Sequence, residues 1–134
     1  MIWSKTNLTP FNSQIKIYKD KFYIVDYENI LHCFSVKDGN KIWSYQTDNF
    51  FVKSKKKLSI IIENEKVIFN NSIGDITTLD ANKGILLWQT PTQNNLVYAE
   101  SASLITSDLV LEKDSIFFRI IEMNSTQLTK IMVF

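Results

Sequence analysis

The strongest indication of the fold of this 134-residue chain is the segment Thr78-Leu79-Asp80-Ala81-Asn82-Lys83-Gly84-Ile85-Leu86-Leu87-Trp88. A strand ends at Asp80, Asn82-Lys83-Gly84 has the composition of a hairpin turn, and an apolar strand follows. Glycine supplies the positive φ that such a turn requires. A similar stretch, Cys33-Phe34-Ser35-Val36-Lys37-Asp38-Gly39-Asn40-Lys41-Ile42-Trp43, stands earlier in the chain and keeps the turn glycine and the tryptophan. Two hairpins of the same design indicate a repeated unit.

The tryptophans stand at positions 3, 43 and 88, which are 40 and 45 residues apart. This spacing is in the range expected of four-stranded propeller blades. Superimposing Trp43 on Trp88 aligns residues 17–47 with 62–92 without a gap. The triplet at 2–4, Ile-Trp-Ser, also reappears at 42–44. The chain is therefore expected to contain about three repeats.

Turn signals divide these repeats into short strands, and the apolar residues lack the three-and-four spacing of a helix. Apolar runs such as Phe22-Tyr23-Ile24-Val25 suit sheets that are covered on both faces. We predict an all-β fold, a partial β-propeller of four-stranded antiparallel blades. The expected blades are 14–47 and 58–92, an incomplete blade at 109–134, and the last strand of a preceding blade at 1–6. The expected strands within them are 14–18, 21–26, 30–36, 41–47, 58–63, 66–70, 75–80, 85–90, 109–112, 115–121 and 127–134.

The stretch 78–88 resembles the tryptophan-docking motif of pyrroloquinoline-quinone (PQQ)-like propeller repeats, because Asp80, Gly84 and Trp88 occupy motif positions. Lys83 stands where that motif has threonine, and the earlier copy has Ser35 in place of the aspartate. The resemblance implies that each tryptophan docks on the adjacent blade, while the aspartate and glycine shape the hairpin beside it. The structural docking residues are then Trp3, Trp43, Trp88, Gly39, Gly84 and Asp80.

Among PQQ-like proteins, the chain is most similar to outer-membrane assembly factors of the BamB family, periplasmic lipoproteins with cofactor-free propellers. The resemblance implies a non-catalytic scaffold in the periplasm or cell envelope, with a BamA-like barrel-assembly component as its partner. PQQ-dependent dehydrogenases share the repeat, but their cofactor sites contain a vicinal disulfide, which the single cysteine cannot form within this chain. A segment of such a dehydrogenase, or a ligand-sensing propeller domain of a receptor, remains an open alternative.

Composition argues against several other classes of protein. The net charge is +1 with both signs mixed along the chain, so no nucleic-acid partner is expected. No stretch approaches the ~20 apolar residues of a membrane-spanning helix. Residues 1–6 lack an apolar segment of signal-peptide length. We therefore expect neither a transmembrane segment nor a signal peptide within this chain.

Side chains with reactive groups are few. His32 is the single histidine and lies in an expected strand, so we expect it to be a packed or surface residue and not a general base. Cys33 beside it is expected to behave as a small buried apolar residue. The chain contains no second histidine or cysteine that could complete a nucleophilic dyad or a zinc site. We predict no catalytic residues, no metal and no cofactor. Phe50 and Phe51 precede a lysine-rich loop and are candidate partner contacts, although covering a blade edge explains them as well.

The incomplete units at the two ends suggest a further hypothesis. Residues 1–6 have the pattern of a fourth strand, and the unit at 109–134 has three expected strands. Within one chain, joining them would demand a three-bladed ring, which is too tightly curved. Between two chains, the same pairing would give a homodimer that completes a six-bladed propeller.

Overall fold

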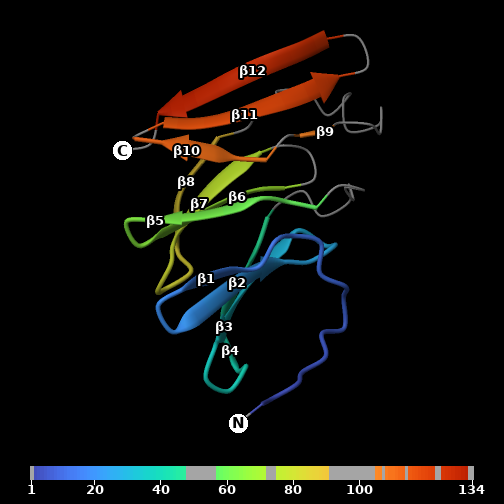
Figure 1. Cartoon of the computed structure of the whole chain (residues 1–134), viewed down its shortest axis with the longest axis vertical. Helices are drawn as coiled ribbons and strands as arrows, with labels where there is room; N and C mark the ends of the chain where they lie inside the picture. Colours follow the sequence, from blue (N-terminus) through green and yellow to red (C-terminus); the bar gives the residue numbers. More distant parts are fainter. Residues whose placement is uncertain are drawn as a thin grey trace.

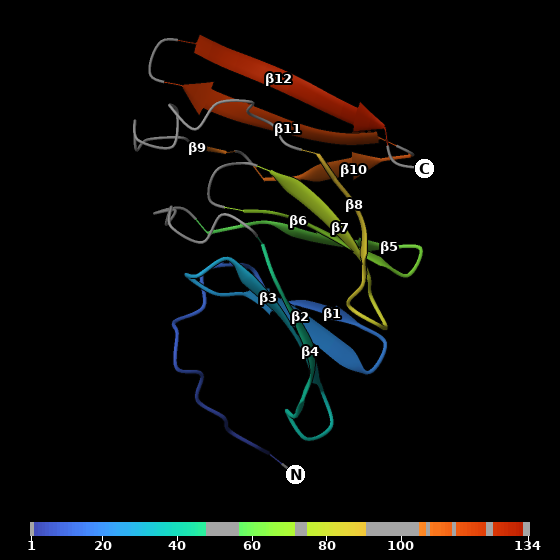
Figure 2. The ribbon, with the colours of Figure 1, turned by 180° about the vertical axis from the view of Figure 1, so that it is seen from behind.

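The structure, a computed structural model, describes residues 2–47, 57–71, 75–90, 105–106, 108–113, 115–122 and 125–132. Within these ranges the regular elements are all β-strands, arranged as three antiparallel sheets stacked face to face (Figures 1 and 2). Sheet 1 has the order β1 (Lys16–Tyr18), β2 (Lys21–Val25), β3 (Ile30–Ser35) and β4 (Lys41–Gln46). Sheet 2 has the order β5 (Ile60–Glu63), β6 (Lys66–Asn70), β7 (Ile76–Asp80) and β8 (Leu86–Thr90). Sheet 3 contains β9 (Ile105–Thr106), β10 (Val110–Glu112), β11 (Ser115–Glu122) and β12 (Ser125–Met132).

Sheets 1 and 2 are simple meanders in which each strand pairs with the next one in the chain. Both contain an irregularity at the same place, between Cys33 and Phe34 in β3 and between Thr78 and Leu79 in β7. Sheet 3 also has four strands. In it, β9 and β10 pair with opposite ends of the same edge of β11, and β12 pairs with the other edge. The all-β prediction of four-stranded antiparallel sheets is therefore confirmed.

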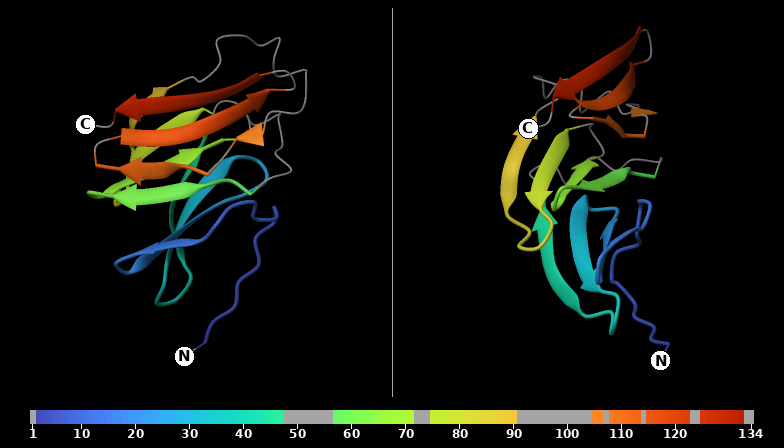
Figure 3. Two further views of the ribbon diagram at one scale, coloured as in Figure 1. Left: turned by 45° about the horizontal axis from the view of Figure 1, so that its top comes forward. Right: turned by 60° about the vertical axis from the view of Figure 1, so that its left-hand side comes forward.

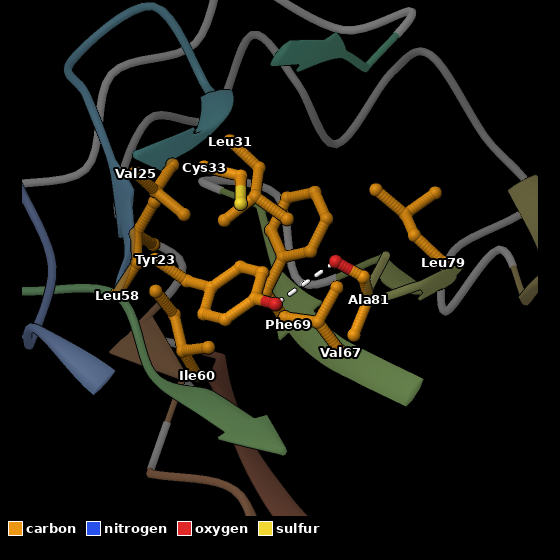
Figure 4. Close-up of a cluster of buried hydrophobic side chains, with 10 residues drawn as sticks. All are labelled: Tyr23, Val25, Leu31, Cys33, Leu58, Ile60, Val67, Phe69, Leu79 and Ala81. Atoms are coloured by element: carbon orange, nitrogen blue, oxygen red, sulfur yellow. Dashed lines mark hydrogen bonds between the residues drawn. The ribbon is translucent and has the colours of Figure 1, made fainter. Parts of the chain in front are cut away.

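A cluster of buried side chains joins sheet 1 to sheet 2 (Figure 4). Tyr23 and Val25 project from β2 into this cluster, and Val67 and Phe69 of β6 meet them from the other sheet. All four are fully buried. Burying a side chain of this size contributes about 1.5–3 kcal/mol, so the contact between sheets carries much of the stability. The cluster consists of Tyr23, Val25, Leu31, Cys33, Leu58, Ile60, Val67, Phe69, Leu79 and Ala81.

A second cluster joins sheet 2 to sheet 3, with Ile68 and Ile76 on one side and Leu109 and Ile116 on the other. Val67 and Ile68 are neighbours in β6 but belong to different clusters, because alternate side chains of a strand point to opposite faces. Sheet 2 is therefore covered on both faces, which explains why its strands are apolar runs (Figure 3).

The described strands agree with the expected ones to within about two residues at each end, apart from two segments. The pattern did not predict β9, which contains only two residues. Residues 2–6 lie outside every described strand. Their assignment as the last strand of a preceding blade stays a prediction.

Candidate functional site

The contact between neighbouring sheets is centred on an indole ring and a turn glycine. Gly84, in the β7–β8 turn, has φ of 69°, and a Cβ added there would lie 2.5 Å from Cδ2 of Trp43. Trp43 extends from β4 of sheet 1, and its Nε1–H donates a hydrogen bond to the carbonyl of Ala81 at 3.2 Å. The turn therefore requires glycine at position 84 for two reasons: only glycine adopts this positive φ without strain, and a side chain would clash with the ring of Trp43.

Trp3 repeats this arrangement on sheet 1. A Cβ added at Gly39, where φ is 68°, would lie 2.6 Å from Cε3 of Trp3. The Nε1–H of Trp3 donates to the carbonyl of Val36 at 2.9 Å. Val36 precedes Gly39 by three residues, as Ala81 precedes Gly84, so the two indoles bind equivalent atoms.

Asp80 stabilises the β7–β8 turn, on which Trp43 packs. Its Oδ1 accepts hydrogen bonds from the backbone N–H groups of Asn82 and Lys83, both at 2.8 Å. In the first repeat, Ser35 occupies the same position, and its Oγ accepts from the N–H of Lys37 at 3.2 Å. A short polar side chain at this position satisfies turn amides in both repeats. Trp88, the third tryptophan, packs against the cluster between sheets 2 and 3.

The carbonyl of Ala81 is a shared acceptor. Besides Trp43, the hydroxyl of Tyr23 donates to it at 2.9 Å, as Figure 4 shows. Both donors belong to sheet 1 and the acceptor belongs to the β7–β8 turn. A carbonyl oxygen has two lone pairs, so both bonds can form at once. Burial raises the pKa of Tyr23, which keeps the hydroxyl a donor.

Cys33 is fully buried in the same cluster, and this burial raises the pKa of its thiol to about 11. The unfolded chain has an ordinary thiol pKa of about 8.5. Because the folded protein holds this proton more tightly, its stabilising contribution is present below about pH 8.5 and is lost as the pH rises through about 11. We expect urea unfolding between about pH 8.5 and 10 to show falling stability, with a smaller fall in Cys33→Ala. Equal slopes in the two proteins would contradict this.

His32 and Asp26 form a buried pair that the sequence patterns did not indicate. His32 is 4% exposed and Asp26 is 2% exposed, and Nε2 lies 2.8 Å from Oδ2. The other carboxylate oxygen accepts from the N–H groups of Glu28 at 2.9 Å and Ile30 at 3.1 Å. A carboxylate oxygen can only accept, so Nε2 carries the hydrogen in this pair. Of the packed and surface positions expected for His32, the structure shows the packed one, and the pair closes the β2–β3 turn.

An aromatic face surrounds this pair. The His32 ring stacks on Phe34 with ring centroids 5.8 Å apart, and Phe11 meets its edge at 6.2 Å. Phe34 stacks on Phe22 at 5.1 Å, and Phe22 stacks on Trp3 at 5.9 Å. These rings lie on the face of sheet 1 that is turned away from sheet 2.

Charged side chains gather at the β1–β2 and β5–β6 turns. Lys19 and Glu65 form an ion pair between the two sheets at 2.9 Å, and Lys21 and Asp20 form a second pair at 3.0 Å. Lys19, Glu65 and Asp20 are more than half exposed, so water screens these pairs and each contributes little stability.

The described ranges contain no group of three or more histidine, cysteine or acidic residues that could hold a metal ion. Within the same ranges, no helix has the length and apolar character needed to span a membrane. Phe50, Phe51 and the lysine-rich run at 53–56 lie outside the described residues, and the suggested partner contact at these phenylalanines stays a prediction.

Four-stranded sheets joined through an indole on a turn glycine define the class of this chain: a partial β-propeller of PQQ-like repeats. A family model described as "Outer membrane protein assembly factor BamB" matches residues 1–126. The chain belongs to this family. No curated protein sequence matches it.

Solved structures with the same fold include BamB from Moraxella catarrhalis, with a TM-score of 0.58 and 16% identity, covering 90% of this chain and 34% of that one. Quinohemoprotein alcohol dehydrogenase from Comamonas testosteroni has a TM-score of 0.65 and 17% identity, covering 84% and 17% of the two chains. A europium-containing methanol dehydrogenase has a TM-score of 0.66 and 12% identity, covering 96% and 25%. The chain thus spans about a third or less of the length of each.

Proposed function

We propose that this chain is part of a non-catalytic protein-binding scaffold of the cell envelope, with a BamA-type barrel-assembly protein as its partner. The observation that carries the proposal is membership of the BamB family over residues 1–126. The described polar groups support a structural role, because Asp26, His32 and Asp80 are all engaged in hydrogen bonds that hold turns.

The outer strand of sheet 2 offers a surface for such a partner. Among the described strands, β8 pairs with β7 alone, so no described strand covers its other edge. Ile85, which directly precedes β8, is 57% exposed, and Leu86 and Leu87 at the start of β8 are 42% and 47% exposed. An edge with exposed apolar side chains is suited to the addition of an extended partner strand. We place the contact at Ile85–Leu87.

The binding test uses the purified chain and the periplasmic part of a BamA-type protein, with affinity measured by calorimetry. Leu87→Lys is expected to weaken binding about tenfold or more, because it puts a charge into an apolar contact. Val110→Lys is the matched control, since Val110 is a similarly exposed apolar residue on sheet 3. Absence of binding by the unaltered chain, or an equal loss in both variants, would refute the proposal.

Dehydrogenases share the fold, so the absence of catalysis needs its own measurement. The residues of this chain do not fit PQQ in the manner of those enzymes, because Cys33 is the single cysteine and is buried between sheets. We expect PQQ with Ca²⁺ to leave the absorbance of the protein equal to the sum of its components. A new absorbance band would favour the enzyme alternative.

A further inference from the structure

The outer strands of sheets 1 and 2 have the same backbone design. β4 and β8 each pair with one described strand, and they follow the same side of the stack, in teal and yellow in the right-hand view of Figure 3. In each strand the register skips the residue before the tryptophan, so Ile42 of β4 and Leu87 of β8 are β-bulge residues. Ile42 is 45% exposed and Leu87 is 47% exposed. The bulge position is therefore apolar and half-exposed at both edges.

The two residues before the bulge differ between the edges. In the alignment of the repeats, Asn40 and Lys41 of sheet 1 correspond to Ile85 and Leu86 of sheet 2. All four side chains are exposed. The β4 edge thus begins with an amide and an ammonium group, whereas the β8 edge begins with two aliphatic side chains.

The ammonium group of Lys41 is held at the β4 edge. Its Nζ lies 5.8 Å from the centroid of the Phe34 ring, which belongs to the residue that pairs with Lys41 in the ladder. Nζ of Lys5 donates a hydrogen bond to Oδ1 of Asn40, which adds a second positive charge beside it. A strand that paired with β4 would have to bring its side chains next to these charges and remove water from them. Charged residues, lysine above all, are a common means of keeping an edge strand unpaired.

β8 lacks this protection. The segment 84–90, Gly-Ile-Leu-Leu-Trp-Gln-Thr, has no charged residue. Leu86 pairs with Leu79, where the equivalent pair of sheet 1 is Lys41 with Phe34. A strand with apolar side chains can therefore lie beside the start of β8 without removing water from a charge.

We propose that Ile85 and Leu86 make β8 the docking edge for an extended apolar segment of the partner, and that Asn40 and Lys41 exclude this segment from β4. This choice of edge rests on the proposed function, in which an added partner strand is the mode of binding. Because the bulge, the turn glycine and the tryptophan are common to both edges, the side chains at two positions decide between them. Exchanging these side chains should then move the binding site from one sheet to the other.

The exchange is tested with the purified chain and the periplasmic part of a BamA-type protein, by calorimetry. The first variant, Ile85→Asn with Leu86→Lys, gives β8 the side chains of β4 and should bind about tenfold or more weakly. The second variant adds Asn40→Ile with Lys41→Leu, which restores the composition of the unaltered chain. It should regain most of the lost affinity, because β4 then has the side chains of β8.

A matched control separates the position of the added side chains from their apolar character. It combines the first variant with Ser44→Ile and Gln46→Leu, which are also exposed positions of β4. Lys41 remains in this control, so its affinity should stay as low as that of the first variant.

The outcomes distinguish this choice of edge from the proposed function. Undiminished binding by the first variant, no recovery in the second, or equal recovery in the control would overturn the choice of edge, while the unaltered chain would still bind its partner. Absence of binding by the unaltered chain would refute the proposed function and this choice of edge together. Recovery in the second variant also shows that the substitutions at 85 and 86 leave the fold intact, because that variant contains them.

Discussion

Gly84→Ala is expected to lower the free energy of unfolding by about 2–5 kcal/mol. Two effects add at this position. An alanine at φ of 69° is strained by about 1–2 kcal/mol, because its Cβ approaches the neighbouring carbonyl. The same Cβ would lie 2.5 Å from the ring of Trp43, and forcing that ring to move costs about 1–3 kcal/mol. Urea unfolding of the purified variant measures the loss.

A double-mutant cycle separates these two effects. Trp43→Ala alone should cost about 3–5 kcal/mol, because it empties a half-buried indole site between the sheets. In Gly84→Ala with Trp43→Ala, the ring is absent and only the backbone strain remains, so the combined loss should be about 1–3 kcal/mol smaller than the sum. Lys83→Ala, an exposed neighbour in the same turn, is the control and should change stability by about 0.5 kcal/mol or less. Strictly additive losses would show that the indole and the glycine are not coupled.

The sequence predicted the fold well because the information is local. Each strand is an apolar run of a few residues, bounded by turn residues such as Lys37-Asp38-Gly39-Asn40, and a meander pairs each run with the next. The recurrence of tryptophan after a turn glycine then indicated the stacking of the sheets. β9 escaped prediction because two residues are too few to show any periodicity.

The contacts between sheets were less accessible to the same reasoning. The sequence pattern places Trp43 near a glycine turn, but not its bond to the carbonyl of Ala81, which Tyr23 shares. Which side chains meet across two sheets depends on their separation and stagger, and no local pattern contains these. The sequence patterns did not predict the Asp26–His32 pair for a related reason. An aspartate at the end of a strand is expected to bond to nearby turn amides, and nothing in the sequence indicates a second bond to a histidine.

Asp26→Ala is expected to destabilise the protein by about 3–5 kcal/mol, because it leaves buried donors without acceptors. Asp26 is the acceptor for the N–H groups of Glu28 and Ile30 and for Nε2–H of His32. The site is almost closed to water, so no solvent molecule replaces the carboxylate easily. Unfolding in urea, followed by circular dichroism, measures the change.

Asp26→Asn distinguishes the turn from the histidine pair. Its amide oxygen can still accept from the turn, as Asn71 does at the equivalent position of sheet 2, where Oδ1 accepts from the N–H of Asp75 at 2.9 Å. Its amide nitrogen would face Nε2, so the imidazole would have to move its hydrogen to Nδ1, a buried atom without a hydrogen-bond partner in the described structure. That rearrangement should cost about 1–3 kcal/mol, less than the loss in Asp26→Ala. Equal losses in the two variants would mean that the backbone N–H groups of Glu28 and Ile30 gain no stability from a side-chain acceptor. Asp26 would then not hold the β2–β3 turn.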